Sequence, residues 1–427
     1  MTTRTDVKPD TTAEENQPKP APYLSPYVNW LWFALVASLT LGASVVATIV
    51  SLATNLLALL LVPVLRECGA MAVIRREPML VMFASAFLVL GCVFALSAEA
   101  PGDMIFLGNF LPLLLCMPVY VLARRHAGQR VAAAVVALAL VGVGLAVFSG
   151  LFDLWVRDLE RAEGYLTGAN VYARIAMLIG FVAGAGVFIG EKRSRFLFCA
   201  GPLLGVLAAA LAASRGALLA APPMLVVFVL FVFCDRRLRR HRRALAGIAA
   251  AGLVALTVGV AILAPSRIAT IPSVIGQIVS GADVTDSDVS DRLAFYRFGW
   301  SLFTESVWIG HGWPNPRTGP DRPPASQAEG KAPRFDYHND LLTFAVAAGI
   351  PGVLALLTIL AAPLAGATRG PRDPFAYGRF YAVCAIVGVT LLTGLSANNI
   401  GRDMPTTAFV MLAAIILGTF RDAPAAP

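Results

Sequence analysis

Charge is scarce in this sequence, and this scarcity decides its class. Only 14% of the 427 residues are Asp, Glu, Lys or Arg, whereas 57% are hydrophobic, and the mean hydropathy is +0.72. This composition excludes an ordinary water-soluble protein and indicates an integral membrane protein. Once the long polar stretch and the tails are set aside, the remaining chain has room for about a dozen helices of about 20 residues each.

Cysteine is also sparse, and acidic residues are missing from the apolar runs. The six cysteines lie in or beside those runs and form no CxxC pair, so neither a disulfide framework nor a cysteine metal site is expected. None of the 26 Asp and Glu residues falls in the middle of an apolar run. An ion-coupled carrier usually needs a charge there, which argues against that class of protein.

Apolar runs of helical length recur along the chain and predict an all-α protein with about twelve transmembrane helices. Residues 28–65 form a run too long for one span, so they predict two short helices that turn near 42–44. The other ten predicted spans are 79–96, 103–122, 131–148, 170–190, 196–213, 217–234, 244–264, 340–362, 378–395 and 406–420. The chain then divides into a tail (1–29), helices 1–9 (30–264), a large outer loop with a helical segment (265–339), helices 10–12 (340–420) and a second tail (421–427).

The basic residues predict how the spans are oriented. Alternate connections carry clusters of Lys or Arg, among them six arginines between 236 and 243. Because cytoplasmic loops hold the excess of Lys and Arg, both termini are expected in the cytoplasm and the segment 265–337 on the outer, periplasmic face. The net charge of +8 is explained in this way by topology, and nucleic-acid binding is not expected.

An acidic pattern in the outer segment has two interpretations. Asp286-Ser287-Asp288 resembles the DxD pair with which nucleotide-sugar enzymes hold a divalent metal, but it directly precedes a helix predicted from about 291 to 307. We favour the second interpretation, in which Asp288, Ser290 or Asp291 caps this helix and complements its dipole.

The same helix carries two arginines, and three tryptophans lie in or near it. Arg292 and Arg297 are five residues apart, about 140° around a helix, so they are not expected to serve one ligand equally. Arg292 lies in the first turn and is better placed to meet an anion. Trp300, Trp308 and Trp313 either stack on sugar rings or mark the membrane interface, and the second interpretation is favoured.

One of the four histidines stands out by its position. His338 lies where the outer loop re-enters the membrane as a helix, with Asn339 or Asp340 as the expected N-cap. A lone histidine there is most often an ordinary interfacial residue, but this one shares the outer face with several arginines. They are Arg174, Arg215, Arg292 and Arg402. Arginine binds phosphate oxygens through charge-assisted bonds, and neutral histidine, with a reference pKa of about 6.5, accepts a proton near neutrality.

With these residues identified, the chain resembles the bacterial O-antigen ligase family, whose relatives include O-antigen polymerases and pilin oligosaccharide ligases. The resemblance covers most of the chain: the twelve spans, the outer loop between spans nine and ten, and a His-(Asn/Ser)-x-x-Leu motif at 338–342. Ser214-Arg215-Gly216 and Asp291-Arg292 resemble the family's outer-face arginine and its loop arginine. The sequence Ile-Gly-His-Gly-Trp at 309–313 looks like the family's Gly-x-Gly turn.

The resemblance implies a GT-C-like glycosyltransferase in the bacterial inner membrane. It would transfer a glycan from undecaprenyl diphosphate to a sugar hydroxyl of lipid A-core, with inversion and without a metal or other cofactor. The resemblance implies that His338 is the general base. The donor diphosphate would be bound by three arginines: Arg215, Arg292 and Arg174. Candidates for supporting roles are Asn339, Arg297 and Arg402.

Three other functions fit parts of the same pattern. A polymerase of the same superfamily would join one lipid-linked glycan to another, and the spelling of the motif favours the ligase. A pilin oligosaccharide ligase would use the same donor with a protein hydroxyl as acceptor. A lipid-glycan flippase, from a different class, would also need outer arginines, but it would need polar residues deep in the membrane and no histidine at a helix entrance.

Overall fold

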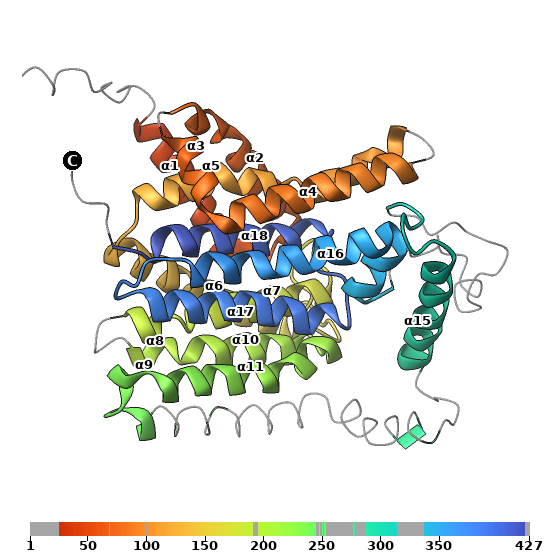
Figure 1. Ribbon diagram of the computed structural model, residues 1–427. Coiled ribbons are helices and arrows are strands. Elements are labelled where there is room, and N and C mark those ends of the chain that lie inside the picture. Colours follow the sequence, from red (N-terminus) through yellow and green to blue (C-terminus); the bar gives the residue numbers. More distant parts are fainter. Residues whose placement is uncertain are drawn as a thin grey trace, which may run out of the picture.

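The computed structural model describes residues 25–67, 69–98, 101–190, 195–244, 287–313 and 337–422, with a few isolated positions between 247 and 280. These residues are helical and contain no strand. The α-helices are α1 (Ser25–Ala37), α2 (Ala47–Leu60), α3 (Ala70–Arg76), α4 (Pro78–Ser97), α5 (Pro112–Arg125), α6 (Gln129–Trp155), α7 (Ala169–Ala183), α8 (Gly186–Ile189), α9 (Arg195–Phe198), α10 (Ala200–Leu211), α11 (Arg215–Cys234), α15 (Ser287–Glu305), α16 (Asp340–Thr368), α17 (Ala376–Gly394) and α18 (Asp403–Thr419). A π-helix, η1 (Ser38–Gly42), and the 3-10 helices η2 (Val62–Arg66), η3 (Pro101–Phe110) and η4 (Arg236–Leu238) extend or precede them. Figure 1 shows the long helices side by side in a bundle, with α15 across one end.

The length and hydropathy of these helices make the chain a multi-pass membrane protein. Within the described ranges, eight segments can cross a membrane: Ala47–Arg66, Pro78–Ser97, Pro101–Arg125, Gln129–Trp155, Ala169–Ile189, Arg215–Cys234, Asp340–Thr368 and Ala376–Gly394. Two shorter apolar stretches, Arg195–Leu211 and Asp403–Thr419, run in the same bundle (Figure 1). Residues 1–24 of the predicted tail 1–29 and nearly all of the predicted span 244–264 lie outside the described residues, so the total of twelve spans stays a prediction. Residues 25–29 already belong to α1.

The first apolar run forms two helices, as the sequence predicts. α1 continues through η1 to Gly42, and α2 begins at Ala47 after a short turn. A Cβ atom at Gly142 of α6 would overlap the Thr40 carbonyl group, so the π-helical segment lies directly against the α6 backbone. The prediction of a turn near 42–44 is confirmed.

Two helices form the centre of the bundle. Every residue from Tyr172 to Ala183 in α7 and from Met404 to Thr419 in α18 is buried. α7 packs against α6, α10 and α17, and α18 packs against α2, α5 and α17. At the α7–α10 contact a Cβ atom on Gly201 would lie 2.6 Å from the Gly180 carbonyl oxygen, so these glycines let the two backbones approach closely.

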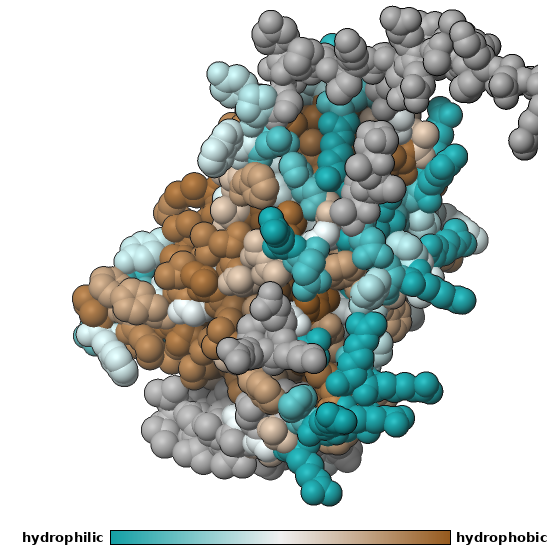
Figure 2. Space-filling view, turned by 90° about the vertical axis from the view of Figure 1, so that its left-hand side faces the viewer, coloured by the Kyte–Doolittle hydropathy of each residue, from teal (hydrophilic) through white to brown (hydrophobic). Residues whose placement is uncertain are grey.

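The bundle has two chemically different ends. The connections 124–130, 236–243 and 369–379 gather at one end, which we call the basic end and which lies on the left of Figure 1. Figure 2 looks onto this end and shows hydrophilic side chains projecting over it beside an apolar flank. α15 lies at the other end, together with the starts of α7, α16 and α18, and we call it the pocket end (Figure 1).

One arginine of the basic end is structural. Arg379 is fully buried and donates hydrogen bonds to the Asp373 carboxylate (3.1 Å) and to the Phe420 carbonyl oxygen (2.7 Å). Beside it, Arg421 donates to the Glu77 carboxylate (3.0 Å). These bonds join the ends of α4, α17 and α18. The guanidinium group of Arg379 therefore bonds to groups inside the protein and does not lie at the surface with the other arginines of this end.

Buried carboxylates lie at the ends of helices. Those of the described chain are Glu77, Asp153, Asp235 and Asp340. Each of the four lies within three residues of a helix terminus or caps one. The prediction that no acidic residue falls in the middle of a span is confirmed for the part of the chain that the structure describes.

α16 is broken near its pocket end. The backbone leaves the helical conformation at Ala348 (φ −140°, ψ 15°) and Gly349 (φ 60°, ψ −153°). Pro351 has no N–H group, so the Ala347 carbonyl oxygen lacks its ordinary helical donor. The Gly312 N–H group, which follows α15, donates to this oxygen instead (3.0 Å).

Two further hydrogen bonds close the break. The His311 N–H group donates to the Val346 carbonyl oxygen (2.8 Å), and the Ile350 N–H group donates to the Val307 carbonyl oxygen (2.8 Å). Gly310 has φ +73°, and a Cβ atom there would lie 2.5 Å from the α16 backbone. The Ile-Gly-His-Gly-Trp turn at 309–313 is therefore the segment that completes the broken helix.

Replacing Gly349 by alanine should destabilise the protein. Its φ and ψ lie in a region that is essentially restricted to glycine, and a Cβ atom would strike the Val307 carbonyl oxygen. We expect Gly349→Ala to lower the free energy of unfolding by at least about 1 kcal/mol, measured by thermal melting in detergent. Gly144→Ala is the matched control because its Cβ atom would enter open space in the middle of α6. Equal melting temperatures for the two variants would contradict this account of the break.

Candidate functional site

His338 is held in an unusual backbone conformation. It has φ +50°, which non-glycine residues rarely adopt, and it is half-buried directly before α16. The Tyr296 hydroxyl of α15 donates to its carbonyl oxygen (3.3 Å), and the Phe295 ring lies 6.3 Å from the imidazole, centre to centre. The next residue, Asn339, is the N-cap, because its side-chain oxygen accepts the Leu342 N–H (3.1 Å). Strained positions of this kind persist only where the surrounding structure fixes them, and they cluster at functional sites.

The connection between α17 and α18 is fixed against the start of α16. The Asn398 side-chain oxygen accepts from the Asn339 N–H (3.1 Å) and the Thr343 hydroxyl (3.0 Å). The buried Asp340 carboxylate accepts from the Asn399 N–H (2.7 Å). Asp340, the alternative candidate for the N-cap, therefore holds the neighbouring connection instead of capping its own helix.

Arg174 holds the same connection from the other side. Its guanidinium group donates to the Asn398 carbonyl oxygen (2.7 Å) and the Asn399 side-chain oxygen (2.7 Å), and its Nε donates to the Asn170 carbonyl oxygen (2.8 Å). Arg174 is only 8% exposed. Arg174 of α7 is thus bonded to the same connection that holds the start of α16, and both Arg174 and His338 line one cavity.

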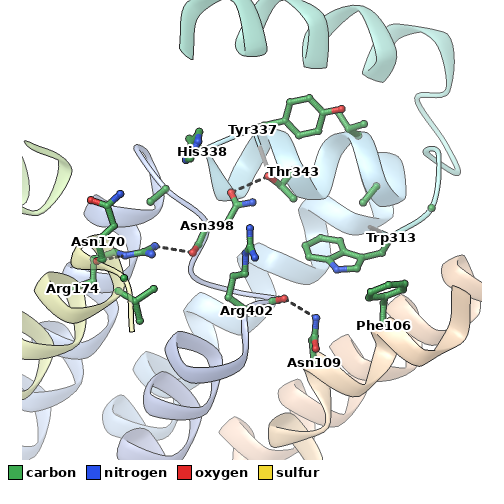
Figure 3. Close-up of a pocket in the computed structure, with 17 residues that line it drawn as sticks. Phe106, Asn109, Asn170, Arg174, Trp313, Tyr337, His338, Thr343, Asn398 and Arg402 are labelled. Carbon is green, nitrogen blue, oxygen red and sulfur yellow. Dashed lines mark hydrogen bonds between the residues drawn. The ribbon is translucent and has the colours of Figure 1, made fainter. Parts of the chain in front are cut away.

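These residues surround a cavity of about 660 Å³ at the pocket end. Figure 3 shows Arg402 reaching into it, with His338, Asn170 and Arg174 on one side and Trp313, Phe106 and Asn109 on the other. We call the side lined by Asn170, Arg174, His338 and Asn398 the arginine end of the cavity. No carboxylate belongs to the cavity lining within the described ranges.

The helix termini add to the positive charge. α7, α16 and α18 all begin at this cavity, where Gly168, His338 and Arg402 are the residues that precede or cap them. Each helix N-terminus carries the equivalent of about half a positive charge. Together with Arg174 and Arg402 they make a site suited to a phosphate or diphosphate group.

Arg215 flanks the arginine end. It is the first residue of α11, and Ser214 before it donates to the Asn170 side-chain oxygen (2.9 Å). A Cβ atom on Gly216 would contact Ser396 of the connection between α17 and α18. The structure therefore brings Arg215 next to the cavity, although it is not among the described residues that line it.

The two arginines of α15 are separated as their spacing predicts. Arg292 lies four residues before Tyr296 and so shares the face of α15 that contacts His338 and the Leu395 carbonyl oxygen (3.2 Å from the Tyr296 hydroxyl). Arg297 is exposed and lies about 100° around the helix from Tyr296, which is about 140° from Arg292. Neither belongs to the cavity lining, but only Arg292 lies on the side that faces the site.

α15 begins earlier than predicted, which changes the interpretation of its acidic start. It includes Ser287, so the three candidates for its N-cap, Asp288, Ser290 and Asp291, all lie inside the helix. Asp286 lies outside the described residues. Over the described ranges, no three His, Cys, Asp or Glu side chains lie close enough together to hold a metal ion.

The three tryptophans have different environments. Trp300 and Trp308 are 62% and 71% exposed, and their predicted position at the membrane interface stays a prediction. Trp313 is buried among Phe94, Phe110 and Phe344 and lines the cavity, so it does not anchor the loop at the surface.

Tyr337 also lines the cavity. Its hydroxyl group is buried and makes no hydrogen bond within the described part of the chain. Burial raises the pKa of this hydroxyl, so Tyr337 remains a neutral group that can donate a hydrogen bond.

Sequence reasoning missed the amide residues of the site. Asn170, Asn398 and Asn399 support Arg174, and Asn109 and Phe106 line the far side of the cavity. A signal was present at Asn170, which lies four residues before Arg174 on one helix face. The adjacent asparagines 398 and 399, between two apolar spans, are a second such signal.

Comparison with protein families is consistent with this arrangement. Residues 200–357, from α10 into the second half of α16, match the family model described as O-Antigen ligase. The matched part includes Arg215, Arg292 and His338 but neither Arg174 nor Arg402. A comparison of the chain with curated proteins finds no match. The resemblance inferred from the sequence is confirmed over residues 200–357, which match this family.

Proposed function

We propose that the protein is an O-antigen ligase, which transfers a glycan from undecaprenyl diphosphate to a sugar hydroxyl of lipid A-core. The observation that carries this proposal is the cavity, in which His338 lies beside Arg174 and Arg402 and no described carboxylate intervenes. This reaction requires positive groups that stabilise a diphosphate leaving group and a base that accepts the proton of the hydroxyl nucleophile. The arginines and His338 offer these two kinds of group in the cavity.

The orientation follows from the charges at the two ends of the bundle. The basic end, with its arginine-rich connections, faces the cytoplasm, and the pocket end faces the periplasm. Both termini are then cytoplasmic, and the protein lies in the bacterial inner membrane. The donor glycan reaches the cavity from the outer leaflet.

The donor diphosphate binds at the arginine end. Arg174, Arg215 and Arg292 neutralise the charge that develops on it, with Arg402 and the N-termini of α7 and α16 as further positive groups. Guanidinium groups and helix dipoles supply the positive charge that a divalent metal supplies in other enzymes. The proposed reaction is therefore metal-independent, with a fold of the GT-C kind.

His338 acts as the general base. It accepts the proton of the acceptor hydroxyl while the hydroxyl oxygen forms a bond to the anomeric carbon of the donor sugar. The bond from this carbon to the diphosphate oxygen breaks, and undecaprenyl diphosphate departs with the electron pair. Attack opposite the leaving group inverts the anomeric carbon, and His338 later returns its proton to water. Asn339 supports this role by fixing the backbone beside the imidazole.

Reconstitution with defined substrates tests the function. Purified protein, undecaprenyl-diphosphate-linked glycan and lipid A-core should yield a glycosylated acceptor, seen as a gel shift, with and without EDTA. Lengthening of the lipid-linked glycan without transfer to lipid A-core would instead identify a polymerase, and transfer only to pilin would identify a pilin ligase. Loss of transfer in EDTA would refute metal independence.

Removing the imidazole should abolish most of the rate. A general base contributes about 10²- to 10⁴-fold, so His338→Ala should reduce ligation by that order while donor binding stays nearly unchanged. The measurement is the initial rate of transfer, combined with a binding assay for the donor. His241→Ala, at the exposed basic end, is the control and should have full activity. If His338→Ala transfers the glycan as fast as the wild-type protein does, His338 is not the general base.

The arginines should affect binding and rate together. Arg292→Ala and Arg215→Ala each remove a charge-assisted contact to the diphosphate, and we expect donor affinity and turnover to fall by about 10- to 100-fold. Arg297→Ala is the matched control, since this exposed arginine lies on the same helix as Arg292 but on another face. If Arg292→Ala and Arg297→Ala behave alike, Arg292 does not bind the donor.

A further inference from the structure

The cavity has a second half whose chemistry differs from that of the arginine end. We call it the aromatic end, and it is lined by Phe106, Asn109, Gly312, Trp313 and Gly401. Figure 3 shows Phe106, Asn109 and Trp313 on the far side of Arg402 from His338. η3 is a 3-10 helix with three residues per turn, so Phe106 and Asn109 lie on one face and both reach the cavity.

The side chains of the aromatic end are fixed before any ligand binds. The Asn109 amide N–H donates to the Gly401 carbonyl oxygen (3.1 Å), and its side-chain oxygen makes no hydrogen bond within the described residues. The Trp313 ring packs against Phe110 (5.4 Å between centroids) and Phe344 (5.4 Å). Gly401 has φ +89°, and a Cβ atom there would strike the Trp313 ring. The wall is therefore held by ring packing and one hydrogen bond, with one amide oxygen left to accept another.

A sugar ring matches this wall. Its C–H faces are apolar and pack on aromatic rings such as Phe106 and Trp313, while its hydroxyl groups donate to an amide oxygen such as that of Asn109. A lipid chain offers no donor to this half-buried amide oxygen, whereas a sugar hydroxyl does. Among the described residues, a second diphosphate would find no positive side chain lining this half apart from Arg402 at its border.

We infer that the aromatic end binds a sugar ring of one of the two glycans, with Phe106 and Trp313 against the ring face and Asn109 accepting from a hydroxyl. The inference rests on the proposed function, because glycan transfer must hold two sugars near one base while the diphosphate occupies the arginine end. A cavity of about 660 Å³ lies within the ordinary range for a ligand larger than a diphosphate group. The ring belongs either to the donor glycan or to lipid A-core, and both present the same chemistry.

Binding measurements with three probes separate these sources. The probes are undecaprenyl diphosphate without a glycan, undecaprenyl-diphosphate-linked glycan, and deacylated lipid A-core oligosaccharide, each titrated alone into purified full-length protein. Phe106→Leu and Asn109→Ala should each lower the affinity for one of the two glycan probes by about tenfold. The affinity for undecaprenyl diphosphate should stay unchanged. Weaker binding of the undecaprenyl-diphosphate-linked glycan assigns the ring to the donor, and weaker binding of the oligosaccharide assigns it to the acceptor.

Matched variants exclude a general loss of stability. Phe87→Leu alters a half-buried phenylalanine of α4 that packs against the core away from the cavity, and Gln129→Ala removes one amide-to-carbonyl hydrogen bond (2.6 Å) at the basic end. The inference is overturned if Phe106→Leu and Asn109→Ala bind both glycan probes as tightly as these controls do. Failure of the wild-type protein to bind undecaprenyl diphosphate would instead refute the proposed donor site, independently of the sugar result.

Discussion

The hydrogen bonds that close the break in α16 hold the rest of the site in place. A backbone carbonyl or N–H group without a hydrogen-bond partner costs several kcal/mol within a membrane. The backbone groups at a break in a helix must therefore bond to another segment. The segment 307–313 supplies them at the break, and the asparagine-rich connection at 395–402 supplies them at the N-terminus. The short first half of α16 is thereby held at both ends. His338 precedes it, and its position depends on both attachments.

The choice of amides around Arg174 has an electrostatic consequence. Asn398 and Asn399 satisfy the guanidinium group with a carbonyl and an amide oxygen, which carry no net charge. The buried Asp340 carboxylate accepts from the backbone N–H groups of Asn399 and Ile400 in the same connection. These two oxygens fix the connection without bringing a net negative charge of their own to the guanidinium group.

Local patterns in the sequence predicted the spans that lie within the described residues, the turn after Gly42, the position of His338 and the separation of Arg292 from Arg297. Each of these depends on residues a few positions apart. Contacts between distant segments were not accessible: Arg174 and its partner Asn399 are 225 positions apart, and nothing local distinguishes the buried Trp313 from the exposed Trp300. The start of α15 was placed four residues late because polar residues that favour caps also occur inside helices.

The burial of α18 has a consequence for biogenesis. This helix is enclosed along its length by α2, α5, α7 and α17, all of which precede it in the chain and leave the ribosome first. During synthesis these helices must assemble around an open slot that α18 later fills. The connection that precedes α18 carries Asn398, Asn399 and Arg402, so the cavity is completed only at that step. A chain that lacks α18 and this connection would therefore have only part of the cavity lining.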